Sequence, residues 1–293
     1  MGRPENAGLR LTWSGSRRAI CDMNNSSGSR PVYVDAHVHL DEYPDTWLGA
    51  VLRQLEEERI VSISTAMAPQ AYQRSLEIQQ RSPWVCATIG VHPWNAHHFV
   101  ATLDDIAPLL EDSPMFGEIG LDYRNVRDRS LYAAQRGVLE FFLSAAKKQD
   151  KIVNVHTSGA EAEVVDLLER YDIGRAIIHW YSGPVEPLRR MVMRGYMFTF
   201  GCEVLSSGFI QSIAHEIPVE QVLTETDNPG GPQWVFGEPA MPELVMPVLQ
   251  ALSIIKGLDE DAAREQVRHN MLSLLGDDSR LEGLRRMLEG TPG

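Results

Sequence analysis

From residue 32 onward, the chain alternates between short apolar runs and longer stretches with amphipathic spacing. The short runs are rich in β-branched and aromatic residues, which favours strands, and the longer stretches separate them as crossover helices would. This alternation predicts a parallel sheet with helices between its strands. The eight runs are residues 32–38, 60–66, 85–91, 115–121, 151–156, 176–180, 196–201 and 222–227.

The stretches between these runs have the spacing of helices. In one of them, Leu139, Phe142, Leu143 and Ala146 recur every three or four positions and therefore share one helix face. Residues 160–170, 185–194, 243–256, 259–275 and 279–290 are similar. A (β/α)8 TIM barrel closes with eight strands and intervening helices, which is the number found here. We find no repeat or internal linker. We therefore expect an α/β fold with one TIM-barrel domain over residues 31–293.

Residues 1–30 differ from the rest of the chain. Gly, Ser, Asn and Arg are frequent there, and apolar periodicity is absent. This composition predicts a disordered or loosely packed N-terminal arm. Such an arm suits the binding of a protein partner, and its composition fits an idle tail equally well.

Composition indicates an ordinary globular protein, with 43% hydrophobic and 23% charged residues. No apolar run approaches the roughly 18 residues of a membrane span, so we expect no membrane association. Cys21, Cys86 and Cys202 lack the paired spacing of a disulfide or zinc motif, which fits a reducing cytoplasm. The net charge of -13 argues against a general DNA-coating protein, although bound cations can reverse the sign of a local site.

Metal-binding residue types recur at the ends of the predicted strands. His37 and His39 end the first run, where alternate side chains point the same way. The carboxyl ends of barrel strands converge on one mouth, so residues far apart in sequence become neighbours there. The equivalent residues on later strands are Glu118, His156, His179 and Asp227.

Four imidazoles and two carboxylates are enough to hold two divalent metal ions. Glu118 is a natural bridge because a carboxylate can offer one oxygen to each metal. Asp227 is the candidate general base, since it could also accept a proton from the attacking water. Histidine ligands suit zinc and carboxylate ligands tolerate magnesium or manganese, so the sequence does not choose between Zn, Mg and Mn.

The order of these motifs resembles the TatD family of metal-dependent deoxyribonucleases, a branch of the amidohydrolase-like barrels. The resemblance covers nearly the whole chain after residue 30 and depends on DAHVHL (35–40), GVHP (90–93), GEIGLDY (117–123), His156, HWYSG (179–183) and ETDNP (225–229). It implies two divalent metals held by His37, His39, Glu118, His156, His179 and Asp227. It also implies hydrolysis of DNA phosphodiester bonds, often from the 3′ end, with His92 contacting the substrate phosphate or a metal-bound water.

The chain departs from the common family pattern in three places. Many relatives have a second histidine where this chain has Trp94, and an arginine soon after the fifth-strand histidine where it has Thr157 and Ser158. The loop 230–232, Gly-Gly-Pro, also differs. Cationic contacts to phosphate are therefore fewer, so metal binding is better supported than substrate identity.

Further residues near the predicted mouth are candidates for smaller roles. Asp122 and Tyr123 follow Glu118 in a loop that could touch substrate, and Arg124 could contact a phosphate. Glu225 lies two residues before Asp227 and could orient a metal ligand through a hydrogen bond.

Two alternatives to a nuclease acting on single-stranded or frayed DNA remain open. One is a hydrolase of amide, ester or lactone bonds, because the same metal chemistry can act on a carbonyl. The other is a partner-dependent subunit of a larger assembly, for example one in phage defence. The sequence leaves the oligomeric state undetermined.

Overall fold

The structure is a computed structural model that describes residues 31–290, and eight parallel strands follow one another in the predicted order. Each predicted run overlaps one strand. The strands are β1 (Tyr33–Val38), β2 (Ile60–Thr65), β3 (Val85–Thr88), β4 (Phe116–Asp122), β5 (Val153–Ser158), β6 (Ala176–His179), β7 (Met197–Phe200) and β8 (Val222–Thr224). β3 and β8 end three residues earlier than predicted. After β8 the backbone turns out of the sheet, and Asp227 has a left-handed φ of 52°.

The strands form a (β/α)8 TIM barrel with two seams. Hydrogen-bonded ladders join β1, β2 and β3 in one sheet and β4 to β8 in another. At the first seam, the Gly117 amide donates to the Ile89 carbonyl over 2.8 Å. At the second seam, the His39 amide donates to the Asn228 carbonyl, also over 2.8 Å. The regular ladder is interrupted at both seams, and individual backbone hydrogen bonds connect the two sheets there.

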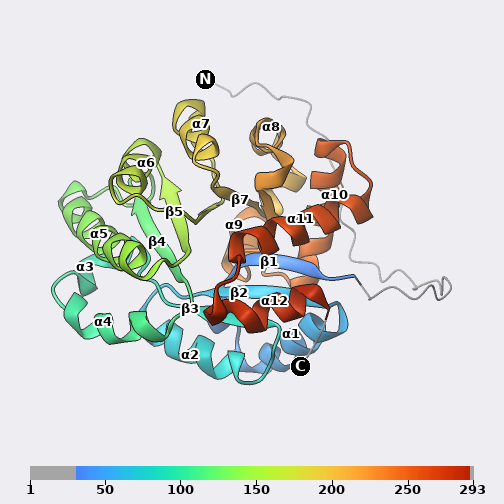
Figure 1. Cartoon of the computed structure of the whole chain (residues 1–293), viewed down its shortest axis with the longest axis horizontal. Helices are drawn as coiled ribbons and strands as arrows, with labels where there is room; N and C mark the ends of the chain where they lie inside the picture. Colours follow the sequence, from blue (N-terminus) through green and yellow to red (C-terminus); the bar gives the residue numbers. More distant parts are fainter. Residues whose placement is uncertain (1–30, 291–293) are drawn as a thin grey trace.

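The helices surround the strands, with α5 and α6 outside β4 and β5 (Figure 1). The α-helices are α1 (Asp45–Glu57), α2 (Pro69–Gln79), α3 (Ala96–Phe99), α4 (Leu103–Asp112), α5 (Tyr132–Gln149), α6 (Glu161–Arg170), α7 (Val185–Met193), α8 (Gly208–Glu216), α9 (Gly230–Phe236), α10 (Val245–Lys256), α11 (Glu260–Leu275) and α12 (Glu282–Glu289). Short 3-10 helices are η1 (Leu40–Glu42), η2 (Arg129–Leu131), η3 (Cys202–Leu205), η4 (Val219–Gln221), η5 (Pro242–Leu244) and η6 (Ser279–Leu281). The five predicted helical ranges are confirmed, with shifts of a few residues at their ends.

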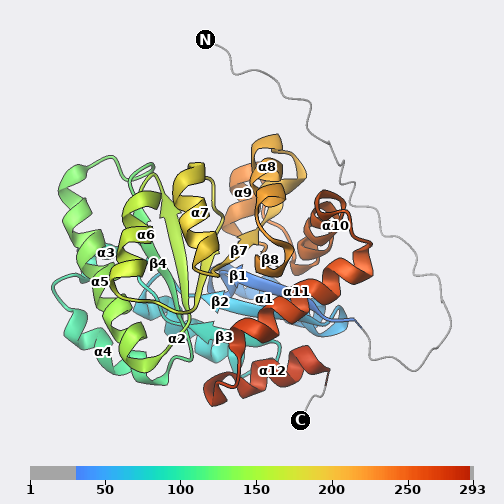
Figure 2. The same ribbon diagram turned by 45° about the horizontal axis from the view of Figure 1, so that its top comes forward.

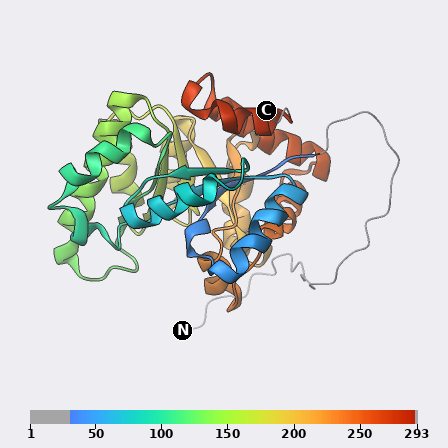
Figure 3. The same ribbon diagram turned by 90° about the horizontal axis from the view of Figure 1, so that it is seen from below.

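The C-terminal helices complete the outer layer. α10 packs against α11, and both lie near β1 and β8 (Figure 2). Seen from below, α11 and α12 lie on the opposite side of the strands from α1 (Figure 3). The second seam is therefore covered by the last part of the chain that the structure describes.

The core is apolar on both sides of the strands. Every residue of β2 and β4 is buried, because one face of each strand lines the barrel interior and the other lies under the helices. The predicted apolar face of α5 is confirmed, since Leu139, Phe142, Leu143 and Ala146 are all buried. The ring of Phe142 packs edge-on against Phe116 of β4, with 5.7 Å between the ring centroids.

Glycine allows the closest approach between neighbouring strands. A Cβ atom at Gly120 would lie 1.9 Å from the carbonyl oxygen of His156, and one at Gly90 would lie 2.4 Å from the amide nitrogen of Glu118. No other residue type fits these two positions without moving a strand. The two glycines therefore fix how near the backbones beside Glu118 and His156 can come.

Within residues 31–290, no helix is both long and apolar enough to cross a lipid bilayer. The predicted N-terminal arm, residues 1–30, lies outside the described residues.

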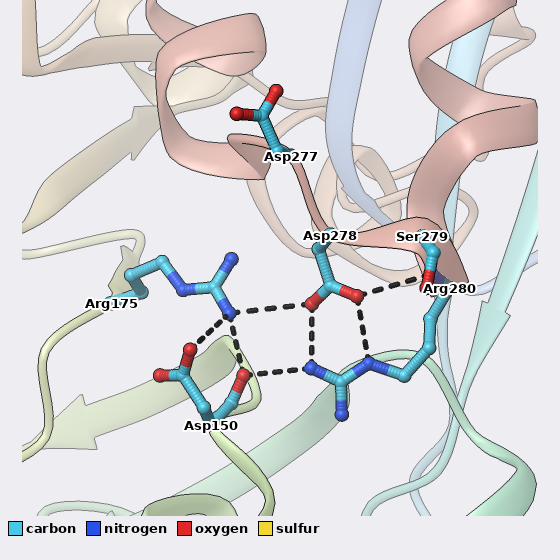
Figure 4. A pocket seen from close by; sticks show the side chains of 6 residues that line it. All are labelled: Asp150, Arg175, Asp277, Asp278, Ser279 and Arg280. Carbon is cyan, nitrogen blue, oxygen red and sulfur yellow. Dashed lines mark hydrogen bonds and ion pairs between the residues drawn. The ribbon is translucent and has the colours of Figure 1, made fainter.

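At the amino ends of β5 and β6, charged side chains line a cavity of about 500 Å³ (Figure 4). Asp278 is central there. Its carboxylate accepts hydrogen bonds from Arg280 Nη2 at 2.6 Å, from Arg175 Nη2 at 3.3 Å, and from the backbone amide of Arg280 within η6. The hydrogen bond from Arg280 lowers the pKa of Asp278 to about 2. This network connects the α11–α12 junction to the strands, at the end of the barrel that is associated with stability.

We predict that Asp278→Asn destabilises the fold by roughly 1–2 kcal/mol at pH 7. The carboxyl pKa is lower in the folded state than in the unfolded chain. Its stabilising effect is therefore complete above about pH 4 and disappears as the pH falls toward 2. Urea unfolding of both proteins between pH 7 and 2 measures this difference. Asp277→Asn is the control, because the Asp277 side chain is fully exposed and should contribute little. A difference that stays constant over this pH range would contradict the prediction.

Candidate metal centre

Six side chains carried by five strands or the loops that follow them meet at the carboxyl ends of the strands. Four lie within β1, β4, β5 and β6, and two lie in the loops that follow β1 and β8. All are buried or nearly so. The structure thus brings together the complete predicted set: His37, His39, Glu118, His156, His179 and Asp227.

Glu118 lies in the middle of this set. Its Oε2 atom is 3.5 Å from His37 Nε2 and 3.4 Å from His39 Nε2. Its Oε1 atom is 2.9 Å from His156 Nδ1 and 3.3 Å from His92 Nε2. The two oxygens of one carboxylate therefore face two different groups of histidines.

Asp227 faces the group on the Oε2 side. Its Oδ1 atom is 3.2 Å from His39 Nε2 and 3.7 Å from His37 Nε2. Burial raises the pKa of Asp227, but the hydrogen bond with His39 and the nearby imidazoles outweigh burial, so the pKa lies below its usual value. The pKa of Glu118 is also held low, because the neighbouring His92 and His37 outweigh its burial. Both carboxyl groups are therefore ionised at neutral pH.

Hydrogen bonds on the outer side of the rings orient the two histidines of β1. His37 Nδ1 lies 2.9 Å from Asn154 Oδ1, and the Asn154 amide nitrogen donates to the Ala36 carbonyl, which fixes the amide orientation. His39 Nδ1 lies 2.8 Å from the Thr65 carbonyl. Both partners only accept, so each Nδ1 carries a proton and each Nε2 faces Glu118 and Asp227. These carboxylates outweigh burial and raise the pKa of both rings, so a bound cation would replace a proton on Nε2.

The other two histidines are oriented in the same way. His179 Nδ1 is 2.7 Å from Glu225 Oε2, and His156 Nε2 is 3.3 Å from Asp122 Oδ2. In each case a carboxylate accepts a hydrogen bond from the outer nitrogen of the ring, and the inner nitrogen faces the centre. Burial raises the pKa of Glu225 to about 8, and a divalent cation beside His179 would oppose that shift by favouring the carboxylate.

His92 has the opposite arrangement. Its Nδ1 atom accepts a hydrogen bond from the Trp94 amide at 3.2 Å, so that nitrogen carries no proton. Burial lowers the pKa of His92, which favours the neutral ring. The proton then lies on Nε2, which faces Glu118 at 3.3 Å. His92 therefore presents an N–H donor to the centre, whereas the outer nitrogen of each of the four predicted ligands is held by an acceptor and the inner nitrogen is left for a metal.

A second connection holds the loop that carries Asp227. Asp35 of β1 is buried, and its carboxylate accepts hydrogen bonds from the Thr226 amide at 2.8 Å and the Thr226 hydroxyl at 2.7 Å. The Asp227 amide then donates to the His37 carbonyl at 3.0 Å. Asp35 thus positions Asp227 against the strand that carries His37.

The donor set fits divalent metal ions. Three groups of side chains have ligand atoms within 4.8 Å of one another, which is close enough to surround a cation. Mixed imidazole and carboxylate ligation suits borderline divalent ions. The groups are His37, His39 and Glu118; His37, His179 and Asp227; and His92, Glu118 and His156.

Asp122 organises the loop after β4. Its Oδ2 atom accepts hydrogen bonds from Trp94 Nε1 at 2.7 Å and from the Asn125 side chain at 2.9 Å. Its Oδ1 atom accepts from the amides of Arg124 and Asn125. The carboxylate is completely buried by these partners and by His156. Direct contact of Asp122 with substrate stays a prediction, and the contacts present here are structural.

Tyr123 and Arg124 lie farther out. The Tyr123 hydroxyl donates to Glu163 Oε2 at 3.0 Å, so this group faces α6. The Arg124 side chain is about half exposed, and its Nη1 atom donates to the Ser182 hydroxyl at 3.1 Å in the loop after β6. Its Nη2 atom also lies 3.6 Å from Glu161 Oε1. The predicted contact of Arg124 with phosphate stays a prediction.

The sequence analysis missed three residues that support the site. Asn154 could have been found, because it lies two positions before His156 and therefore shares its strand face. Trp94 was noted only as a departure, yet its amide and its ring nitrogen hold His92 and Asp122 in place. The role of Asp35 depends on the contact with Thr226 across the second seam, which no local pattern shows.

Comparisons with known proteins agree with this geometry. The family model for the TatD related DNase matches residues 34–276. The human protein named deoxyribonuclease TATDN3 is 26% identical over 259 residues, covering 82% of this chain and 93% of the relative. An uncharacterised metal-dependent hydrolase of Methanocaldococcus jannaschii is 24% identical over 244 residues, covering 81% of this chain and 94% of the relative.

Solved structures confirm the fold. The TatD homologue YJJV of Escherichia coli superposes with a TM-score of 0.74 at 24% identity, covering 83% of this chain and 97% of that chain. A TatD family hydrolase of Entamoeba histolytica superposes with a TM-score of 0.72 at 17% identity, covering 84% and 99%. With the family model matched over most of its length, the chain belongs to the TatD family of metal-dependent deoxyribonucleases.

Proposed function

We propose that this protein hydrolyses phosphodiester bonds at the 3′ ends of single-stranded or frayed DNA, with two divalent metal ions. The observation that carries the proposal is the position of the Glu118 carboxylate. Its two oxygens face two separate groups of histidines. One bridging carboxylate between two donor groups is the arrangement that a two-metal hydrolase requires.

The six predicted ligands divide around Glu118. His37, His39 and Asp227 would hold one ion on the Oε2 side. His156 and His179 would hold the other on the Oε1 side. When bound, such ions would supply Lewis acidity to the phosphodiester and would lower the pKa of the attacking water. Zinc, magnesium and manganese all remain candidates, because the ligands combine imidazole and carboxylate.

The protein groups around the centre have separable roles in this proposal. Asp227 is ionised and would accept the proton of the attacking water. The Nε2–H group of His92 would donate to a phosphate oxygen or to the attacking water. Arg124 would bind a neighbouring phosphate at the rim. These few donors would provide local attraction on a chain whose net charge is -13.

Three broader features belong to the same proposal. We place the enzyme in the cytoplasm, as one barrel domain over residues 31–293, with residues 1–30 as an arm that could bind a protein partner. All six predicted ligands are carried by the described part of this chain.

The first prediction for the metal centre concerns turnover. Glu118→Ala and Asp227→Ala should each reduce cleavage of a 3′-labelled single-stranded oligodeoxynucleotide by more than about 100-fold, because each removes a predicted ligand. The assay uses protein stripped with chelator and then supplied separately with Mg²⁺, Mn²⁺ or Zn²⁺. Glu169→Ala on α6 is the control, since that carboxylate pairs with Arg190 at the surface. Full turnover in either site variant would rule out the assignment. Failure of the wild type to cleave DNA with any metal would favour a carbonyl substrate or a partner-activated enzyme.

The second prediction separates His92 from the ligands. His92→Ala should keep the wild-type metal stoichiometry and lose about 10²–10³-fold in kcat, because it removes one donor and no lone pair. His37→Ala should lose bound metal. Elemental analysis of dialysed protein, together with turnover rates, measures both effects. Loss of one metal equivalent in His92→Ala would show that the tautomer assigned to His92 is wrong.

The third prediction concerns ligand orientation. Asn154→Leu should weaken metal binding by roughly 10–100-fold, because Leu cannot accept the outer proton of His37. Asn154→Asp keeps an acceptor at that position and should retain most of the affinity. Competition with a chromophoric chelator measures the two affinities. Equal weakening in both variants would attribute the effect to packing and not to the hydrogen bond.

A further inference from the structure

A groove of about 280 Å³ opens at the same end of the barrel as the candidate metal centre. One wall is formed by Tyr43, Pro44 and Trp47, at the junction of η1 and α1. The other wall is formed by Pro229, Gly230 and Gln233 at the start of α9, and Pro239 completes the lining. Both walls belong to loops that follow strands, and β1 and β8 are neighbours in the barrel, so the groove lies on the catalytic face.

Short backbone connections link both walls to predicted metal ligands. The His39 carbonyl accepts from the Glu42 amide at 3.1 Å, directly before Tyr43. The Asp227 carbonyl accepts from the Gly231 amide at 2.7 Å, within the opposite wall. A Cβ atom at Gly231 would lie 2.7 Å from Asp227 Oδ2, so only glycine allows α9 to begin this close to the centre. The groove is thus an extension of the site and not a separate surface feature.

The chemistry of the groove selects a flat, uncharged group. None of its seven lining residues is charged, and most of the exposed lining is apolar. Trp47 lines the groove and is 41% exposed overall, so part of the residue is open to a ligand. The Gln233 amide nitrogen already donates to the Gly237 carbonyl, so Oε1 is the remaining polar atom of that side chain and can accept a hydrogen bond.

Phosphate is a poor occupant of this groove. No cation lines it, and Glu42 Oε2 lies 3.8 Å from the place of a Cβ atom on Gly230, so an anion would be repelled. A heterocyclic base has the opposite properties, because it offers an apolar face for stacking and donors at its edge. The volume is at the lower end of small-molecule pockets, which suits one base and not a longer segment.

We propose that this groove is a base-binding subsite in which Trp47 stacks on the nucleobase next to the scissile phosphate. The inference rests on the proposed deoxyribonuclease function and adds to it a contact with the base. Stacking of this kind tolerates every base, since each has a π-face. The subsite would therefore hold the end of a single strand in place without reading its sequence.

The test compares an intact oligodeoxynucleotide with one that has an abasic sugar at a nucleotide flanking the 3′-terminal phosphodiester. Binding is measured by fluorescence anisotropy on the metal-loaded protein, with phosphorothioate linkages to slow cleavage, and kcat/KM is measured on the ordinary linkages. The wild type should prefer the intact strand by about tenfold or more in both measurements. Trp47→Ala should lose this preference with unchanged values for the abasic strand, and Trp47→Phe should keep most of it.

Phe209→Ala is the matched control, because it removes an exposed aromatic ring on α8 that does not line the groove. It should behave as the wild type. A preference that survives in Trp47→Ala, or that falls equally in Phe209→Ala, would overturn the subsite. Cleavage of DNA by the wild type without any preference for the intact strand would overturn the subsite and leave the nuclease standing. Preferential binding that depends on Trp47, without cleavage, would support the subsite and overturn the nuclease.

Discussion

The position of Glu118 between two groups of imidazoles is the constraint on which the rest of the site depends. A buried carboxylate is costly unless positive charge compensates it, and here the histidines on both sides provide partners. Those histidines are held by outer acceptors, so the ring nitrogens that would bind a cation already face the centre. The site is therefore preorganised, and the folding free energy of the barrel offsets the unfavourable burial of its charged groups.

Much of this could be predicted from the sequence. Barrel strands alternate with helices, so the eight apolar runs were sufficient to indicate the fold, and residues at strand ends such as His37 and Glu118 followed from that geometry. The ends of the strands could not be predicted as well. β8 stops at Thr224, because the backbone must leave the sheet for Asp227 to reach His39. That requirement is set by a contact across the barrel and not by local propensity.

The difference between His92 and the four predicted ligands also required the structure. Four of the five histidines are buried and His156 is nearly so, and residue type alone does not distinguish them. The distinction lies in the partner of the outer nitrogen, which is an acceptor in four rings and the Trp94 amide in the fifth. Trp94 thus has a structural role at a position that the sequence analysis noted only as a departure from the family pattern.

The connection between Asp35 and Thr226 has a thermodynamic consequence. It joins β1 to the loop after β8, at one of the two seams where the regular ladder is interrupted. Predicted ligands lie on both sides of that seam, so a cation bound between His37 and Asp227 would bridge the first and last strands. Ligand binding to the folded state alone stabilises it by mass action. Metal occupancy and the integrity of the barrel would thus be linked equilibria, coupled at the seam.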